Sequence, residues 1–200
     1  MKKLLKFILI IVFFSSISDN ALAQLSINTG LKGGLNFANF SLDPKSIYDY
    51  SYYSGIVAGF YLEVDIWGPI GFQGELLFSQ KGAKFNTNTE EVTVSLNYIE
   101  IPILLKYSIP LGPTLSFDIQ GGPYFGQKLS EKWRGFSYKP EQDFFKNSDY
   151  GITLGVGVKF NALFNYIYID TRYSKGLADI SLDNGEVKNK NMVIIAGIGF

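Results

Sequence analysis

The chain has 200 residues, of which 46% are hydrophobic, 16% aromatic and only 18% charged, and it contains neither Cys nor His. Charged residues make up roughly 25% of an ordinary soluble domain, so this composition indicates that much of the surface faces something other than water. A sequence without Cys and His excludes disulfide frameworks, zinc–thiolate sites and His-based catalysis. Equal numbers of basic and acidic residues argue against nucleic acid as a partner.

The first 23 residues have the three-part pattern of an export signal. Lys2, Lys3 and Lys6 precede an apolar stretch at 7–14, and Ala21-Leu22-Ala23 has small residues where a signal peptidase cuts. The apolar stretch is shorter than the ~20 residues that a membrane-spanning helix needs. We therefore expect residues 1–23 to be a cleaved signal peptide and residues 24–200 to form a single domain.

The rest of the chain alternates apolar with polar or small residues, which is the period of a β-strand. This pattern predicts strands at 26–40, 54–66, 70–85, 92–109, 114–128, 149–160, 165–176 and 191–200. The connections at 67–69, 110–113 and 161–164 are short, whereas those at 41–53, 86–91, 129–148 and 177–190 are longer and polar. Short and long connections thus alternate strictly along the chain.

This alternation is typical of an up-and-down barrel in an outer membrane, which has short periplasmic turns and long outer loops. A tilted membrane strand needs about 9 to 11 residues, so the length of the chain suits eight strands with their connections. The sequence therefore predicts an all-β fold, an eight-stranded antiparallel up-and-down transmembrane β-barrel. Ends of the strands near the connections carry aromatic residues, including Trp67, Tyr107 and Tyr166 at the short turns, which predicts girdles at the membrane interfaces.

The charges fall on one face of each predicted strand. In strand 54–66, Phe60 and Leu62 share the face opposite to Glu63 and Asp65. Strand 92–109 changes phase near Tyr98 and Ile99, where a β-bulge would restore the alternation. A membrane barrel places its apolar face toward lipid and its polar face toward the lumen, so we expect these charges to point inward.

The predicted lumen contains six cations and six anions. They are Lys32, Lys81, Lys106, Lys128, Lys159 and Arg172 with Glu63, Asp65, Glu75, Glu100, Asp118 and Asp170. The interior of an eight-stranded barrel is just wide enough for side chains to fill, so we expect a packed ion-pair network rather than a proton or ion path. Inward-facing Gly33, Gly155 and Gly157 would make room for the long side chains.

Three segments resemble a known family. They are Gly30-Leu31-Lys32-Gly33-Gly34-Leu35-Asn36-Phe37, Tyr98-Ile99-Glu100-Ile101-Pro102-Ile103-Leu104-Leu105-Lys106-Tyr107 and Ile169-Asp170-Thr171-Arg172-Tyr173-Ser174-Lys175-Gly176-Leu177. Together with the terminal Phe200 they resemble the PorT-like outer-membrane β-barrel proteins of Bacteroidota. The resemblance implies that Phe200 is a recognition signal for the barrel-assembly machinery, and it suggests a link to envelope biogenesis or secretion.

The connection 129–148 carries the residue types that form interface anchors, namely Trp133, Arg134, Phe136, Tyr138, Phe144 and Phe145. These residues either form a recognition surface or fold back over the rim of the barrel. The connection 177–190 includes Asp179, Asp183 and Glu186, but their spacing does not match a calcium loop and Asp183-Asn184-Gly185 is more simply a tight turn. We therefore expect no metal site.

Catalysis would need a nucleophile beside a base. A carboxylate pair such as Glu63 and Glu100 is conceivable, but salt bridges explain these groups more simply. We expect a non-enzymatic protein without cofactor in the outer membrane of a Gram-negative bacterium, whose partners are membrane lipid, the barrel-assembly machinery during biogenesis and an envelope protein at the long loops. A small pore or transporter and a soluble lipocalin-like barrel remain as alternatives.

Overall fold

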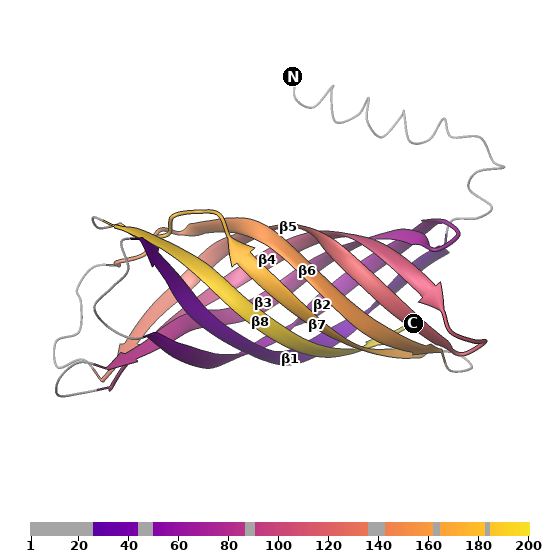
Figure 1. Ribbon diagram of the computed structural model, residues 1–200, viewed down its shortest axis with the longest axis horizontal. Helices are drawn as coiled ribbons and strands as arrows, with labels where there is room; N and C mark the ends of the chain where they lie inside the picture. Colours follow the sequence, from indigo (N-terminus) through magenta and orange to yellow (C-terminus); the bar gives the residue numbers. More distant parts are fainter. Residues whose placement is uncertain (1–25, 44–49, 87–90, 136–142, 162–164, 183–184) are drawn as a thin grey trace, which may run out of the picture.

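Eight strands follow one another around a closed ring in the computed structural model (Figure 1). The structure describes residues 26–43, 50–86, 91–135, 143–161, 165–182 and 185–200. The strands are β1 (Ser26–Asp43), β2 (Tyr50–Trp67), β3 (Ile70–Asn86), β4 (Glu91–Pro110), β5 (Leu115–Arg134), β6 (Ser148–Asn161), β7 (Tyr166–Gly176) and β8 (Glu186–Gly199). Every neighbouring pair is antiparallel, and β1 pairs with β8. The predicted eight-stranded up-and-down barrel is confirmed. No helix among these residues is long and apolar enough to cross a membrane.

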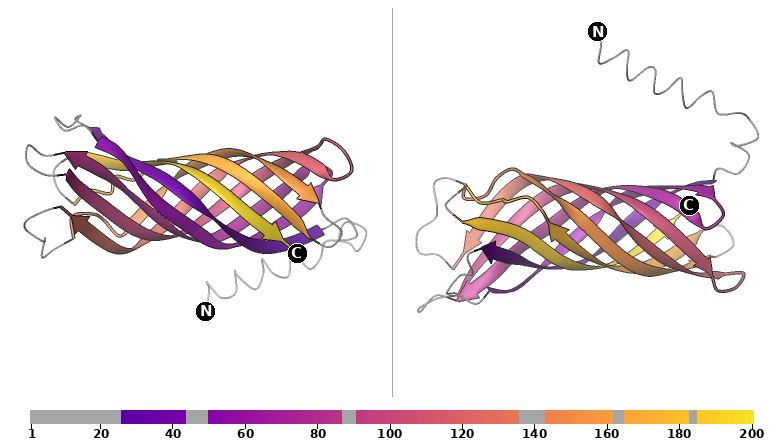
Figure 2. Two further views of the ribbon diagram at one scale, coloured as in Figure 1. Left: turned by 90° about the horizontal axis from the view of Figure 1, so that it is seen from below. Right: turned by 45° about the horizontal axis from the view of Figure 1, so that its top comes forward.

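The two ends of the barrel differ in their connections (Figure 2). At one end, called the short-turn end below, Gly68 and Pro69 join β2 to β3, and Gly68 adopts a φ of 53° that a residue with a Cβ rarely takes. The C terminus lies at this end, where Phe200 and Thr29 exchange backbone hydrogen bonds of 2.9 and 3.2 Å across the β1–β8 seam. The opposite end carries the longer connections and is called the loop end.

Strands near the loop end are longer than the sequence pattern predicts. β5 continues to Arg134 instead of ending at 128, and β8 begins at Glu186 instead of 191. In the β4–β5 ladder, Tyr98 pairs with Lys128 and Asn97 with Ser130, so Leu129 is an extra residue. The predicted phase change within 92–109 is wrong, because β4 keeps one alternation, with Leu96, Tyr98 and Glu100 all buried. The bulge lies on β5 instead. Because it resets the alternation, pairing continues as far as Thr93 and Arg134, and the apparent loop is partly strand.

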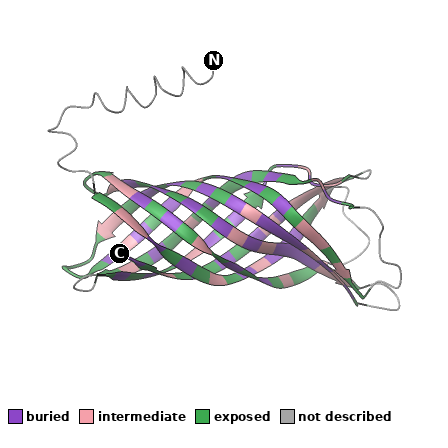
Figure 3. Ribbon diagram, turned by 180° about the vertical axis from the view of Figure 1, so that it is seen from behind, coloured by how far each residue is buried: buried purple, intermediate pink, exposed green. Residues whose placement is uncertain are grey.

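Burial alternates along each strand (Figure 3). In β2 the side chain of Phe60 is 63% exposed, whereas Glu63 is 1% exposed. Ile56 and Leu62 also point outward, which is the reverse of what a soluble lipocalin-like barrel requires. The barrel therefore has an apolar belt outside and polar groups within, the arrangement of a membrane barrel.

Candidate functional site

The charged side chains in the lumen form four groups of ion pairs. The central group joins three strands. The Glu75 carboxylate on β3 accepts hydrogen bonds from Lys32 on β1 and from Arg172 on β7, the latter at 2.7 Å. Arg172 also donates to both oxygens of Asp170, at 2.8 and 2.9 Å. All four side chains are at most 4% exposed. Buried ions cost several kcal/mol unless they are paired, so this group ties the strands to one another.

A second group lies nearer the short-turn end. The Lys106 ammonium contacts Glu63 at 2.8 Å and Asp118 at 2.9 Å, and Lys159 lies 3.5 Å from Glu63. Asp65 is only half-buried and forms no ion pair with a described residue, but it accepts a hydrogen bond of 3.2 Å from Asn28. Of the predicted lumen charges, Asp65 is thus the one outside the network.

The third group lies between the central group and the loop end. Lys81 pairs with Glu100 and with Asp149, the latter at 3.1 Å, and its ammonium lies 4.2 Å from the centre of the Tyr124 ring. Asp149 also accepts a hydrogen bond of 2.9 Å from Asn189 on β8. Asp149 was not among the predicted lumen charges, although it is the first residue of the predicted strand 149–160 and shares the inward face with Thr153 and Lys159, so the alternation was enough to place it.

The fourth group closes the loop end. Lys128 pairs with Glu131 at 2.9 Å and with Asp143 at 3.1 Å, and it also donates to the carbonyl oxygen of Phe145. The alternation reverses after the bulge at Leu129, which turns Glu131 inward. Glu131 was missed because no signal in the sequence places a bulge at Leu129, and Asp143 was missed because it lies in the predicted connection 129–148, where alternation gives no guide.

Tyrosines fill the lumen at the short-turn end. The hydroxyl of Tyr61 donates to that of Tyr166 at 2.8 Å, and the rings of Tyr61 and Tyr168 meet edge to face with centroids 5.3 Å apart. The assignment of Tyr166 to an outer girdle is therefore wrong. It shares its face with Asp170 and Arg172, so the alternation of β7 was enough to place it inside.

Glycines make room for these rings. A Cβ added to Gly197 would lie 2.3 Å from the ring of Tyr168, and one added to Gly199 would lie 2.1 Å from that of Tyr166. Gly155 and Gly157 likewise leave space for Arg172 and Asp170. Gly33 is different. It is exposed on the outer face of β1, next to the inward Lys32, so its predicted inward position is wrong.

At the loop end, two connections fold over the lumen and form a cap, defined here as residues 143–147 and 177–182. A β-bridge joins Phe145 to Ser181, and Lys146 pairs with Asp179 at 2.7 Å. Phe145 and Ile180 are buried in an apolar cluster with residues from the strands, which are Phe40, Ala83, Val94, Leu96 and Tyr98. The cap therefore closes the barrel with packed side chains.

The predicted recognition residues that the structure describes lie on β5, inside the apolar cluster of the cap or on the surface. Trp133 and Arg134 lie on the extension of β5, which corrects their assignment to a loop, and Trp133 packs against the apolar cluster of the cap. Phe145 is 8% exposed within that cluster, whereas Phe144 is 45% exposed. Phe136 and Tyr138 lie outside the described residues.

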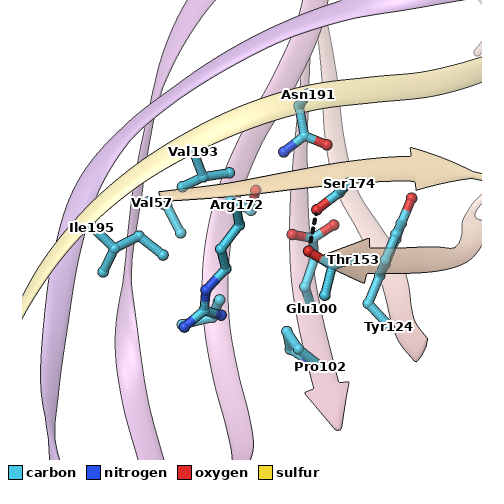
Figure 4. A pocket seen from close by; sticks show the side chains of 12 residues that line it. Val57, Glu100, Pro102, Tyr124, Thr153, Arg172, Ser174, Asn191, Val193 and Ile195 are labelled. Atoms are coloured by element: carbon cyan, nitrogen blue, oxygen red, sulfur yellow. Dashed lines mark hydrogen bonds between the residues drawn. The ribbon is translucent and has the colours of Figure 1, made fainter. Parts of the chain in front are cut away.

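Two enclosed spaces among the described lumen residues are small, and Figure 4 shows the side chains that line the first of them. One cavity of about 20 Å³ lies between Glu100, Arg172 and the hydrogen-bonded pair Thr153 and Ser174. Another of about 10 Å³ lies beside Lys106 and Asp118. Each has room for about one water molecule. A larger pocket of about 580 Å³ lies open at the short-turn end and is lined in part by Asp65, Ser116 and Lys159. Farther inside the barrel, the paired side chains neutralise one another and leave little room for solvent.

The acidic residues of the last connection do not gather into a metal site within the described chain. Asp179 instead accepts hydrogen bonds from the backbone of Ser181 at 3.1 Å and of Val187 at 3.0 Å. Glu186 pairs with Lys188 at 2.6 Å. These carboxylates stabilise the entry into β8.

Solved structures of similar shape are outer-membrane barrels. OprG of Pseudomonas aeruginosa has a TM-score of 0.57 and 14% identity over 86% of this chain and 94% of its own. Neisserial surface protein A has a TM-score of 0.51 and 10% identity over 88% of this chain and 97% of its own. At such low identity the likeness supports the fold alone.

No curated protein sequence matches the chain. The family model described as "Outer membrane protein beta-barrel domain" matches residues 19–182, which is most of the chain. That match agrees with the closed ring of eight strands, the apolar outer belt and the charged lumen. The chain belongs to the outer membrane protein β-barrel domain family.

Proposed function

We propose that this protein is a non-enzymatic outer-membrane protein whose barrel is an inert scaffold and whose loop end contacts a partner protein or a surface ligand. The observation that carries the proposal is the filled lumen. Tyrosines toward the short-turn end, ion pairs along the middle and the cap at the loop end enclose cavities of about 20 and 10 Å³ within the described interior, while a larger pocket beside Asp65 and Lys159 is open at the short-turn end. Contacts at the outer surface then remain as the means of action, and a small pore is disfavoured.

A patch at the loop end suits such a contact. Leu182 is 59% exposed and donates its backbone N–H to the carbonyl oxygen of Phe144 at 3.0 Å. The ring of Phe144 meets that of Trp133 with centroids 5.5 Å apart. We call Trp133, Phe144 and Leu182 the loop-end patch. Aromatic residues that are held rigidly beside polar ones are typical anchors of protein interfaces.

The remaining parts of the proposal concern export and assembly. Residues 1–23 would direct the chain across the inner membrane of a Gram-negative cell. Phe200, which is 66% exposed at the β1–β8 seam, would be read by the barrel-assembly machinery. The resemblance to PorT-like proteins supports a role in envelope biogenesis or secretion.

Site-specific photo-crosslinking tests the contact. A photoreactive phenylalanine analogue placed at Leu182 in intact cells should give one discrete adduct of higher mass, and the variant carrying Phe144→Ser in addition should lose most of it. The same analogue at Tyr52, a 60% exposed residue at the loop end, serves as the matched control. Adducts of equal yield at both positions, or none at Leu182, would contradict a contact at the patch.

A further inference from the structure

Two lysines on the outer face of the barrel stand directly opposite each other. Lys175 on β7 pairs in register with Lys190 on β8, and these strands are neighbours in Figure 1. Both side chains share the outward face with Tyr173 and Met192, which are exposed. Like charges at directly opposite positions repel each other, because their Cβ atoms lie only about 4.5–5.5 Å apart.

No described carboxylate neutralises this pair. Neither lysine forms an ion pair among the residues that the structure covers, while Lys188, two positions along β8, is already paired with Glu186. The other register neighbours of the two lysines are Ile152 on β6 and Asn39 on β1, which carry no charge. The pair thus forms an anion-attracting position built into the wall of the barrel.

An apolar groove lies directly beside the pair, toward the middle of the belt. It has a volume of about 450 Å³ and is lined by the exposed side chains of Ile119, Leu154, Val156, Tyr173 and Met192, together with Thr171. Tyr173 and Met192 are themselves opposite in register, two residues from Lys175 and Lys190. At about 3.4 Å per residue, the backbone positions of Tyr173 and Met192 at the edge of the groove lie about 7 Å along the strands from those of Lys175 and Lys190.

The position of the pair relative to the membrane identifies the kind of occupant. Long connections of such barrels face the outside of the cell, so the loop end, where β7 finishes and β8 starts, lies at the outer leaflet. On β8 the outward positions change from Ile194 and Met192 to Lys190, Lys188 and Glu186, so the apolar belt ends at the lysine pair on this strand and we place the pair at the depth of lipid headgroups. Lipid phosphates carry negative charge there and accept hydrogen bonds from ammonium groups.

We propose that the β7–β8 face binds one acylated, phosphorylated lipid of the outer leaflet. The phosphate lies between the ammonium groups of Lys175 and Lys190 and removes their repulsion, while an acyl chain occupies the groove beside Tyr173 and Met192. The proposal rests on the barrel standing in the outer membrane and is independent of the loop-end contact.

Native mass spectrometry of the full chain in a non-ionic detergent tests the headgroup half of the site. Purified lipid A is titrated as the probe, with phosphatidylcholine, whose phosphate is masked by choline, for comparison. The wild-type barrel should retain one lipid A at concentrations where it retains no phosphatidylcholine. The double variant Lys175→Gln/Lys190→Gln should bind lipid A about tenfold or more weakly, since two phosphate contacts are lost.

The matched control is Lys132→Gln/Arg134→Gln, which removes two exposed positive charges from β5 at the same end of the barrel. This control should leave lipid A binding within about twofold of the wild type. Equal weakening by both double variants would mean a diffuse electrostatic attraction and would overturn the site. Retention of lipid A by Lys175→Gln/Lys190→Gln would overturn it as well.

Filling the groove tests the acyl half. Thr171→Trp places a large apolar side chain among the lining residues and leaves both lysines in place, so lipid A binding should fall although the headgroup contacts persist. Inorganic phosphate at millimolar concentration should not displace lipid A, because it lacks the acyl chain. Full displacement by phosphate, or undiminished binding by the Thr171 variant, would show that the groove takes no part. The heat-dependent shift of each barrel in SDS gels verifies that the variants are folded.

Discussion

Glu75 is the shared acceptor of the central lumen group. It accepts hydrogen bonds from Lys32 on β1, from Gln73 on its own strand and from Arg172 on β7. Glu75→Gln keeps the volume of the side chain and removes its charge, which leaves two buried cations short of a partner. Breaking a buried ion pair in this way costs about 3–5 kcal/mol. Urea unfolding in detergent micelles should show a loss of that size.

The matched control for this prediction is Glu91→Gln. Glu91 pairs with Lys84 at 3.2 Å, but the two side chains are 58% and 39% exposed. Exposed pairs contribute about 0–1 kcal/mol, so the unfolding midpoint of this variant should remain close to that of the wild type. Similar losses for both variants would contradict the idea that burial decides the contribution of these pairs.

Gly197 shows how a missing side chain shapes the lumen. Gly197→Ala would bring a methyl group within 2.3 Å of the Tyr168 ring, and overpacking of this kind costs about 1–3 kcal/mol. Tyr168→Leu alone should also destabilise the barrel, because it leaves a cavity. In the double variant the two costs should cancel in part, so a double-mutant cycle measured by urea unfolding should give a clear coupling energy. Strict additivity would mean that the ring and the glycine do not constrain each other.

At the scale of elements, the cap is held by a pH-sensitive carboxylate. The hydrogen bond from Lys146, with the backbone amides of Val187 and Ser181, lowers the pKa of Asp179 from its ordinary 3.8 to about 2. A carboxyl whose pKa is depressed in the folded state stabilises that state above its unfolded pKa and loses the effect as pH falls toward the folded value. The cap should therefore loosen between about pH 4 and pH 2.

Trp133 reports this loosening, because its ring lies against Phe144 and Phe145, with centroids 5.5 and 6.2 Å away. The chain has two tryptophans, so Trp67→Phe leaves Trp133 as the single indole. Its fluorescence should shift to the red as pH falls from about 4 to 2. With Asp179→Asn added, the shift should already be present at neutral pH and change little. Parallel pH profiles for both proteins would assign the transition to another carboxylate.

The extension of β5 also changes which part of the chain could be deleted without damage to the barrel wall. Connection 129–148 is not a free loop, since residues up to Arg134 pair with β4 and Phe145 packs inside the apolar cluster. The alternative in which the aromatics fold back over the rim describes Phe145, whereas Phe144 remains outside. A variant that deletes the whole connection would remove wall as well as cap, so single substitutions at the patch are the sharper tools.

For the whole molecule, the filled lumen predicts that the barrel does not conduct. Ion pairs span the interior from Glu63 near the short turns to Lys128 below the cap, with tyrosines at one end and Phe145 at the other. The protein reconstituted in a planar bilayer should therefore give no steady single-channel openings, while an open porin prepared in the same way conducts. Reproducible ion-selective steps would contradict the closed lumen and favour the pore alternative.

Much of this architecture was predictable because a strand in a membrane barrel obeys one strong local rule. Lipid makes a charge costly on the outer face, so alternation alone places Glu63 inside and Phe60 outside before any neighbour is known. The strand count followed from the alternation of short and long connections, and the short turns at 67–69 and 110–113 are signalled locally by Gly and Pro. The same rule places Gly33 outside, since it follows the inward Lys32, and Tyr166 inside, since it shares a face with Asp170. Both residues were nevertheless predicted to lie on the opposite side of the wall.

Only the tertiary structure decided which charges meet and where the regular pattern ends. Register joins Lys32 to Glu75 and Lys175 to Lys190, and register depends on pairing between strands, which alternation within one strand does not encode. The bulge at Leu129 turned Glu131 inward and moved Trp133 from a loop to the wall, because one extra residue inverts every later position. The sequence by itself thus determined which side chains face lipid and which face the lumen, because a charge is costly against lipid. The closure of the ring determined which side chains become partners across the lumen.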